Sequence, residues 1–144
     1  MLSYAEFCDK FNIRLDAQQA QAVQCTDRAV LLLAVPGSGK TTTLITRAAY
    51  LVYCMGIAPE NILTMTYTVA ASAEMRARFS AAFGEEYAKR LEFRTINGVC
   101  ESIINRYARQ TRAQRFDLVS DNGAILAEVF RTVRGEYPEG GDIK

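Results

Sequence analysis

The chain has 144 residues, of which 49% are hydrophobic, and its 17 basic and 16 acidic side chains give a formal net charge of +1. This length and apolar content suit a folded domain and exclude a disordered tail, while the near-zero charge gives no indication of a nucleic-acid or basic partner. Because the chain has no histidine, imidazole bases, histidine-containing triads and histidine-ligated metals are excluded.

The cysteines and the absence of targeting signals favour a cytoplasmic protein with reduced thiols. None of the four cysteines forms a CxxC pair, and we expect them to serve as small buried hydrophobes. Glu6 and Asp9 lie where a secretory signal would need apolar residues. The longest charge-free apolar segment, 48–59, is far shorter than the roughly 18 residues of a membrane span, so we expect no membrane partner.

The first part of the chain predicts helices on either side of a strand. Ser3 can cap a helix that ends near Phe11, and Asp16 can cap a second helix. The continuous apolar run 29–35 predicts a buried central strand. Apolar residues at helical spacing then predict a helix over 41–55, which Gly56 would end.

The remainder of the chain continues the alternation of strands and helices. In chain order we predict a strand over 61–67, a helix over 70–83 and a short strand over 91–94. The next predicted helix has Ile96, Val99, Ile103 and Tyr107 on one stripe. An extended segment over 116–119 then precedes a helix that Ser120 or Asp121 can cap and that ends near Arg134. This order indicates an α/β fold with a parallel sheet covered on both faces. Three strands are few for such a sheet, which usually has about five or six. We therefore expect an unfinished sheet at the front of a longer protein, with a small complete domain as the alternative.

Segment 34–41, Ala-Val-Pro-Gly-Ser-Gly-Lys-Thr, lies between the first expected strand and its helix. It matches the P-loop pattern except that alanine replaces the first glycine. The glycines allow successive N–H groups to converge on phosphate oxygens at a helix N-terminus. Lys40 would reach the β and γ phosphates and Thr41 would bind Mg²⁺, which makes both candidate catalytic residues. The candidate nucleotide-binding residues of this segment are Pro36, Gly37, Ser38, Gly39, Lys40, Thr41 and Thr42.

The residues before the P-loop match a second pattern. Segment 15–23, Leu-Asp-Ala-Gln-Gln-Ala-Gln-Ala-Val, resembles the Q motif of superfamily 1 DNA helicases of the UvrD, Rep and PcrA type, Leu-Asn-x-x-Gln-x-x-Ala-Val, with Asp16 in place of asparagine. The resemblance implies that the nucleotide is ATP and that Gln19 reads the adenine edge, which suits an amide that can donate and accept at once.

Two later segments also resemble motifs of these helicases. Segment 66–75 resembles motif Ia, and the resemblance implies that Thr66, Tyr67 and Thr68 contact single-stranded DNA, where an aromatic face can stack on a base. Val69 and Ala70 replace the usual asparagine and lysine.

Segment 93–100 resembles the following Thr-x-His-Ser-Phe motif, which implies DNA contacts from Thr95 and Asn97. Asn97 replaces the usual histidine and Gly98 the usual serine. Nine basic and four acidic residues over 76–115 could form a basic face along phosphates, although an ordinary solvated surface explains most of the arginines slightly better.

The resemblance implies a P-loop NTPase fold of the RecA-like type. Residues 1–110 would be the front part of the first RecA-like, ATP-binding domain, and residues 111–144 the start of a helical insertion. The full protein would be an ATP-dependent single-stranded-DNA translocase or helicase, with its remaining domains supplied in cis. The chain alone should be inactive, because Asp117 and Asp121 follow too weak a strand to serve as the Mg²⁺ carboxylates.

Two alternatives remain open. A helicase-like regulatory module that binds nucleotide without DNA coupling would explain the replacements at Val69, Ala70 and Asn97. A small P-loop kinase would suit the length of the chain, but it would leave the matches at Gln19 and Tyr67 unexplained.

Overall fold

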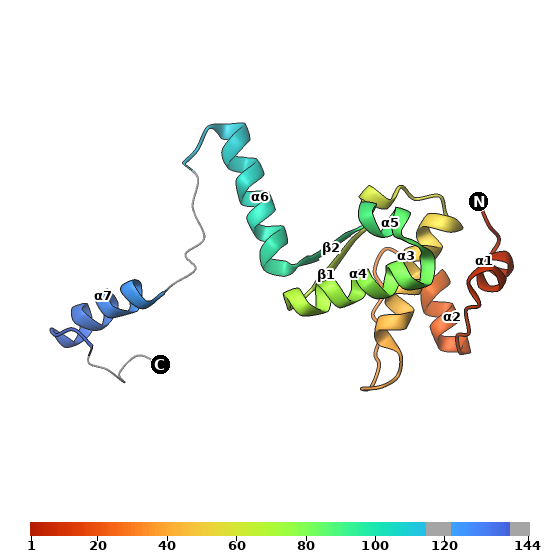
Figure 1. Cartoon of the computed structure of the whole chain (residues 1–144), viewed down its shortest axis with the longest axis horizontal. Helices are drawn as coiled ribbons and strands as arrows, with labels where there is room; N and C mark the ends of the chain where they lie inside the picture. Colours follow the sequence, from red (N-terminus) through yellow and green to blue (C-terminus); the bar gives the residue numbers. More distant parts are fainter. Residues whose placement is uncertain (115–121, 139–144) are drawn as a thin grey trace. The chain divides into compact units, whose positions relative to one another are not determined.

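The computed structural model describes residues 1–114 and 122–138, which fall into two compact units, Met1–Ile103 and Ile104–Lys144. The first unit mixes helices and strands, whereas the described part of the second is helical (Figure 1). The elements are α1 (Tyr4–Phe11), α2 (Ala17–Gln24), α3 (Lys40–Tyr53), the short 3-10 helix η1 (Pro59–Asn61), β1 (Leu63–Thr66), α4 (Val69–Phe83), α5 (Glu85–Arg90), β2 (Glu92–Thr95), α6 (Ile96–Thr111) and α7 (Gly123–Arg134).

Both N-terminal helices begin with the expected caps. The Ser3 hydroxyl accepts a hydrogen bond from the Glu6 N–H, and the Glu6 carboxylate accepts from the Ser3 N–H at 2.7 Å. In α2, Asp16 accepts from the Gln19 N–H at 2.8 Å, and the Gln19 amide oxygen accepts from the Asp16 N–H at 3.1 Å. Such reciprocal bonds satisfy donors that a helix start leaves unpaired, so the predicted starts of α1 and α2 are confirmed.

The sheet consists of β1 and β2, which pair in parallel and place Thr66 opposite Thr95 (Figure 1). The connection between them contains α4, which packs against both strands, as a parallel crossover requires. The predicted strands 61–67 and 91–94 are therefore confirmed, with shifted ends. Because the pairing is parallel, both strands end at the same edge of the sheet.

The core of the first unit is rich in aromatic side chains from α1, α3 and α4. Phe7 is fully buried and stacks on Phe83 with ring centroids 5.9 Å apart. Phe11 also contacts Phe83, and the Tyr53 hydroxyl donates to the Phe83 carbonyl at 2.8 Å. Met75 and Phe79 are buried on the predicted face of α4. These contacts fix α1 against the helices that carry the loop and the sheet crossover.

The prediction of a buried strand over 29–35 is wrong. The structure assigns no strand to these residues, and Leu31 and Leu33 are each 83% exposed. An apolar run becomes a central strand only when other strands pair with it, and within residues 1–114 and 122–138 the two strands pair with each other.

The prediction that helices cover both faces of the sheet is also wrong for β1. Leu63 and Met65 are 45% and 54% exposed, while Thr64, which points to the opposite face, is buried. Successive strand residues point to opposite faces, so only one face of β1 is covered. Helix α5, which the sequence pattern does not predict, is short, begins after Gly84 and contains the Glu85–Lys89 ion pair.

In the second unit, α7 ends at the predicted residue, Arg134, and begins after Asn122. The predicted caps Ser120 and Asp121, and the extended segment 116–119, lie outside the described residues. Helix α6 is confirmed, but the stripe members Ile103 and Tyr107 are exposed.

Two further predictions concern the cysteines and a membrane span. The expectation that the cysteines are buried small hydrophobes is confirmed only in part: Cys8 and Cys54 are partly buried against the core, Cys25 is half-buried and Cys100 is exposed. All four are free thiols. Across the part of the chain that the structure describes, no helix has the length and apolar character to cross a membrane.

Candidate nucleotide-binding site

The loop over 34–41 has the backbone conformation that its glycines allow. Gly37 and Gly39 have φ values of +83° and +77°, a left-handed region that side chains with a Cβ rarely adopt. Gly39 is the N-cap of α3, and the Ser38 hydroxyl and N–H both donate to the Val35 carbonyl. The loop therefore ends at the N-terminus of a helix, where free N–H groups and the helix dipole favour an anion.

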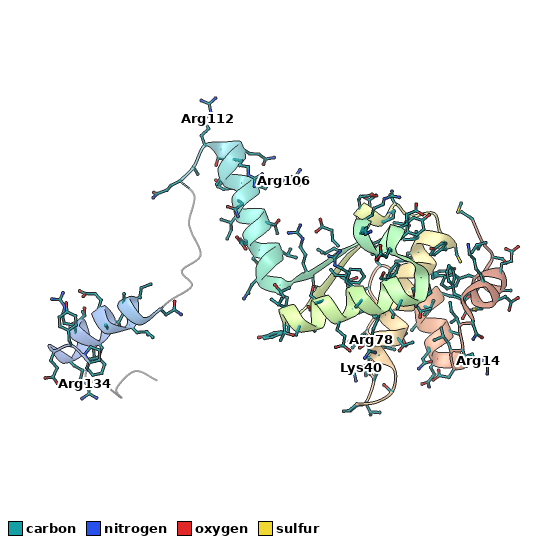
Figure 2. The ribbon with its side chains drawn as sticks, in the orientation of Figure 1. Arg14, Lys40, Arg78, Arg106, Arg112 and Arg134 are labelled. Carbon is teal, nitrogen blue, oxygen red and sulfur yellow. The ribbon has the colours of Figure 1, made fainter. Side chains whose placement is uncertain are left out.

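Lys40 is the first residue of α3 and is labelled beside the loop in Figure 2. Its ammonium donates to the Val35 carbonyl at 2.9 Å and to the Ala34 carbonyl at 3.4 Å. The side chain is exposed, and its two partners are neutral backbone groups. A phosphate oxygen could replace these carbonyls and would give the ammonium a charged partner, which makes a stronger hydrogen bond.

Gln19 lies against the loop, although it is 19 residues away in the chain. Its amide nitrogen donates to the Ser38 carbonyl at 3.1 Å, while its amide oxygen accepts from the Asp16 N–H. A Cβ built on Gly39 would lie only 3.0 Å from the same amide nitrogen. The expected proximity of the Gln19 segment to the loop is therefore present, and the amide keeps one N–H and one oxygen lone pair for a ligand.

A pocket of about 270 Å³ lies between the start of α2 and the loop. Its lining includes Gln19, Ser38 and Lys40, three of the predicted residues, together with Asp16, Gln18, Leu32, Leu33, Ala34, Val35 and Thr43. The predicted residues Pro36, Gly37, Gly39, Thr41 and Thr42 are not part of this lining. Thr41 is half-buried and Thr42 is exposed in the first turn of α3.

The metal prediction rests on the hydroxyl of Thr41 alone. Residues 1–114 and 122–138 contain no group of three or more His, Cys, Asp or Glu side chains that could hold a metal ion. A divalent cation at Thr41 would therefore need its other ligands from a nucleotide, water or residues elsewhere in the protein.

Arg47 is a residue of this region that the sequence analysis missed. Its Nη1 donates to the carbonyls of Ala22 at 2.8 Å and Val23 at 3.2 Å, and also to that of Cys25. It thereby joins α3 to the end of α2. In the sequence Arg47 appears as a single charged residue within the segment 41–55, for which a helix is predicted.

The predicted DNA-contacting residues lie at the edge where β1 and β2 end. The Thr68 hydroxyl accepts from the Ala71 N–H at 3.1 Å and so caps α4, and the Thr95 hydroxyl accepts from the Gly98 N–H at 3.0 Å. Thr66 lies opposite Thr95 in the register.

Two other predicted residues near this edge are open to solvent. The side chain of Tyr67 is 90% exposed, and Asn97 is exposed in the first turn of α6. The edge therefore presents hydroxyl groups, an aromatic face and an amide at helix starts.

The basic residues over 76–94 already have partners within the fold. Arg78, Lys89 and Arg94 form ion pairs with acidic side chains near them in the chain, and Arg76 donates to the Ala88 carbonyl. The hydrogen bond from Arg90 to Glu60 lowers the pKa of the Glu60 carboxyl and raises that of the Arg90 guanidinium. Residues 76–94 therefore form a largely ion-paired surface, and whether the wider segment 76–115 contacts phosphates stays a prediction.

Known proteins that are similar to this chain share the region that contains these motifs. The model of the UvrD/REP helicase N-terminal domain family matches residues 15–137. The chain is similar to the ATP-dependent DNA helicase PcrA of Staphylococcus epidermidis, with 33% identity over 121 residues, 82% of this chain and 16% of the relative. It is 42% identical over 106 residues to the putative ATP-dependent DNA helicase YjcD of Bacillus subtilis, covering 74% of this chain and 14% of the relative.

The chain thus spans 14% to 16% of the length of these two relatives. The family match includes the Q motif, the P-loop and the two later segments, so the resemblance stated from those motifs is confirmed. The chain belongs to the UvrD/REP helicase N-terminal domain family.

Proposed function

We propose that this chain is the ATP-binding N-terminal portion of a cytoplasmic, ATP-dependent single-stranded-DNA translocase or DNA helicase. The observation that carries the proposal is the hydrogen bond from the Gln19 amide to Ser38 in a loop with two left-handed glycines at the head of α3. This bond supports the proposal, because an amide of the kind that can read a base lies beside a loop of the kind that can bind phosphates.

Different residues of the loop would contact different parts of the triphosphate. Gly37 and Gly39 would present backbone N–H groups, Ser38 would do so once its N–H leaves the Val35 carbonyl, and Pro36 begins the turn. The first N–H groups of a helix have no intrahelical acceptor, and in α3 these belong to Lys40, Thr41 and Thr42. Lys40 would exchange the carbonyls of Ala34 and Val35 for the β and γ phosphate oxygens.

Thr41 would hold Mg²⁺ through its hydroxyl, with phosphate oxygens as further ligands. When bound, this ion neutralises charge that develops during phosphoryl transfer. The carboxylates that complete its coordination, and the groups that position the attacking water, would come from the rest of the full-length protein in cis. We infer that residues 1–144 alone bind ATP weakly and hydrolyse none.

Single-stranded DNA would bind at the edge where β1 and β2 end. Tyr67 would stack on a base, because its ring is exposed in the short connection between β1 and α4. The hydroxyls of Thr66, Thr68 and Thr95 and the amide of Asn97 would contact phosphates. We place the ATP-binding part in residues 1–110 and the start of a helical insertion in residues 111–144.

One observation favours a second candidate function, a nucleotide-binding regulatory module without DNA coupling. Val69 and Ala70 are both exposed at the start of α4, where helicases of this type have a polar and a basic residue. The site therefore lacks a positive charge that would attract the DNA backbone.

Binding of a fluorescent ATP analogue to the full-length protein tests the nucleotide site. We expect Lys40→Ala to weaken binding at least tenfold, the effect of about 1.4 kcal/mol that a charged hydrogen bond can supply. The control Lys89→Ala removes the same charge from α5 and should leave the affinity unchanged. Equal affinities for Lys40→Ala and the unaltered protein would refute the assignment. Single-stranded-DNA binding then separates the two candidates, because the regulatory module predicts none.

A further inference from the structure

Helix α2, which contains Gln19, has few features of its own that stabilise it. It has eight residues, none of them charged, and its last turn contains no basic residue. A helix this short is marginal in water, so its orientation must come from tertiary contacts. Val23 supplies one, since it is fully buried.

Arg47 supplies a second contact, at the other end of α2 from the loop-facing amide. The carbonyls of Ala22 and Val23 lie in the last turn, where a helix leaves acceptors without intrahelical donors. The guanidinium of Arg47 donates to both and to the Cys25 carbonyl just beyond. Its positive charge also faces the negative end of the α2 dipole.

The same helix α3 therefore determines both parts of the candidate site. Lys40 begins α3 at the phosphate-binding loop, and Arg47 lies about two turns further along it. Gln19 is attached to the loop at one end of α2 by its bond to Ser38, while Arg47 holds the other end. If the Arg47 bonds are lost, α2 keeps the contacts of Val23 and Gln19 but loses those at its last turn, and we expect it to tilt and to move the Gln19 amide relative to the phosphate site.

We propose that Arg47 is a positioning residue for base selection: it fixes α2 so that Gln19 presents its remaining N–H and lone pair to adenine. This inference rests on the proposed ATP-binding function. Adenine offers an acceptor and a donor on the edge that an amide can read, whereas guanine offers two acceptors there. The preference for ATP over GTP therefore measures the position of Gln19, while phosphate contacts bind both nucleotides alike.

Affinities of the full-length protein for fluorescent ATP and GTP analogues test this role. We expect Arg47→Ala to reduce the preference for ATP about fivefold, the worth of one well-placed hydrogen bond, with little change in GTP affinity. Arg47→Lys should restore part of the preference, because an ammonium keeps the charge but lacks the planar fork. The control Arg78→Ala breaks an exposed ion pair on α4 and should leave the preference unchanged. An unchanged preference in Arg47→Ala, or an equal loss of both affinities, would overturn the proposal.

A double mutant separates positioning from a general structural effect. If Arg47 acts through Gln19, adding Arg47→Ala to Gln19→Ala should not reduce the preference for ATP further. An additional loss as large as that in the single mutant would overturn the role. If Arg47→Ala does not fold by circular dichroism, Arg47→Met replaces it in both experiments, since it keeps the packing of the stem and removes the donors.

Failure of this inference is distinguishable from failure of the proposed function. If Lys40→Ala leaves the affinities for both nucleotides unchanged, the nucleotide site itself is wrong, and the role of Arg47 falls with it. If Lys40→Ala weakens both and Arg47→Ala leaves the preference unchanged, the ATP site stands and only the positioning role is overturned.

Discussion

The amide nitrogen of Gln19 donates to the carbonyl oxygen of Ser38 at 3.1 Å, and this bond joins two segments that are separate in the sequence. The amide oxygen accepts from the Asp16 N–H, so the two ends of the amide are not interchangeable. A carbonyl can only accept and an N–H can only donate, and a flipped amide would lose both bonds. The fold therefore determines which end of Gln19 would donate and which would accept from a base.

Replacing Gln19 by glutamate tests this arrangement. The carboxylate of Gln19→Glu can still accept from the Asp16 N–H but cannot donate to Ser38, whose carbonyl would then face a negative oxygen. We expect ATP affinity to fall and the free energy of unfolding to drop by about 0.5–1.5 kcal/mol, the net contribution of one hydrogen bond, because the bond is exposed and water can reach the Ser38 carbonyl. The measurements are analogue binding and thermal melting.

The matched control for this change is Gln21→Glu, which adds the same charge at an exposed position of α2. Gln21→Glu should change neither the ATP affinity nor the free energy of unfolding appreciably. If Gln21→Glu and Gln19→Glu behave alike, the charge on α2 and not the bond to Ser38 explains the result.

Alanine at the two loop glycines should have unequal effects. Both have positive φ, which costs a residue with a Cβ roughly 1–2 kcal/mol. The Cβ of Gly39→Ala would also meet the Gln19 amide at 3.0 Å, whereas that of Gly37→Ala would meet nothing within 4 Å. We therefore expect Gly39→Ala to lower both the melting temperature and ATP affinity more than Gly37→Ala does.

Repeating the glycine comparison in a Gln19→Ala background isolates the contact. With the amide removed, the two alanine variants should become equivalent in melting temperature, because only the backbone cost remains. A persistent difference would mean that Gly39 is needed for some reason other than its approach to Gln19.

Local signals in the sequence predict the backbone of the loop and the start of α2, because these features are local; the roles of the site residues stay predictions. The two glycines and the lysine of 34–41 occupy the head of α3 as expected, and the Asp16 cap places Gln19 in the first turn of α2. Each feature depends on backbone conformation or capping within a few residues, and such preferences act without the rest of the fold.

Features that depend on distant partners could not be predicted. The run 29–35 is apolar enough for a central strand, but its burial requires strands beside it that the described residues do not supply. The bond from Arg47 to Ala22 crosses 25 residues, and nothing in the spacing of an isolated arginine indicates which carbonyls it will meet. Tertiary contacts determine both the exposure of 29–35 and the partners of Arg47.

The start of α4 offers a test of DNA binding. Val69→Asn with Ala70→Lys restores the residues usual in the resembling helicases at exposed positions beside Tyr67. We expect single-stranded DNA to bind more tightly, with the salt dependence of log K steeper by about 0.7 for one added phosphate contact. The measurement is a fluorescence titration of a labelled oligonucleotide at several salt concentrations.

The control for this prediction is Ala81→Lys, which adds the same charge to an exposed position near the other end of α4. It should change affinity and salt dependence less than the substitution beside Tyr67. Equal effects would indicate a general charge contribution and would argue against a DNA contact at the start of α4.

The free thiols should react in an order set by their surroundings. Burial, followed by the nearby Cys8, raises the pKa of the Cys54 thiol, whereas Cys100 is exposed on α6. The thiolate is the nucleophile, so a raised pKa means that a smaller fraction of Cys54 is reactive at a given pH. The rate of Cys54 alkylation should therefore rise at a higher pH than the rate of an ordinary thiol. With iodoacetamide at about pH 8, mass spectrometry of peptides should show Cys100 modified before Cys54, and the difference should narrow as the pH rises. Equal rates for Cys54 and Cys100 at that pH would show that the packing of α1 against α3 does not shield Cys54.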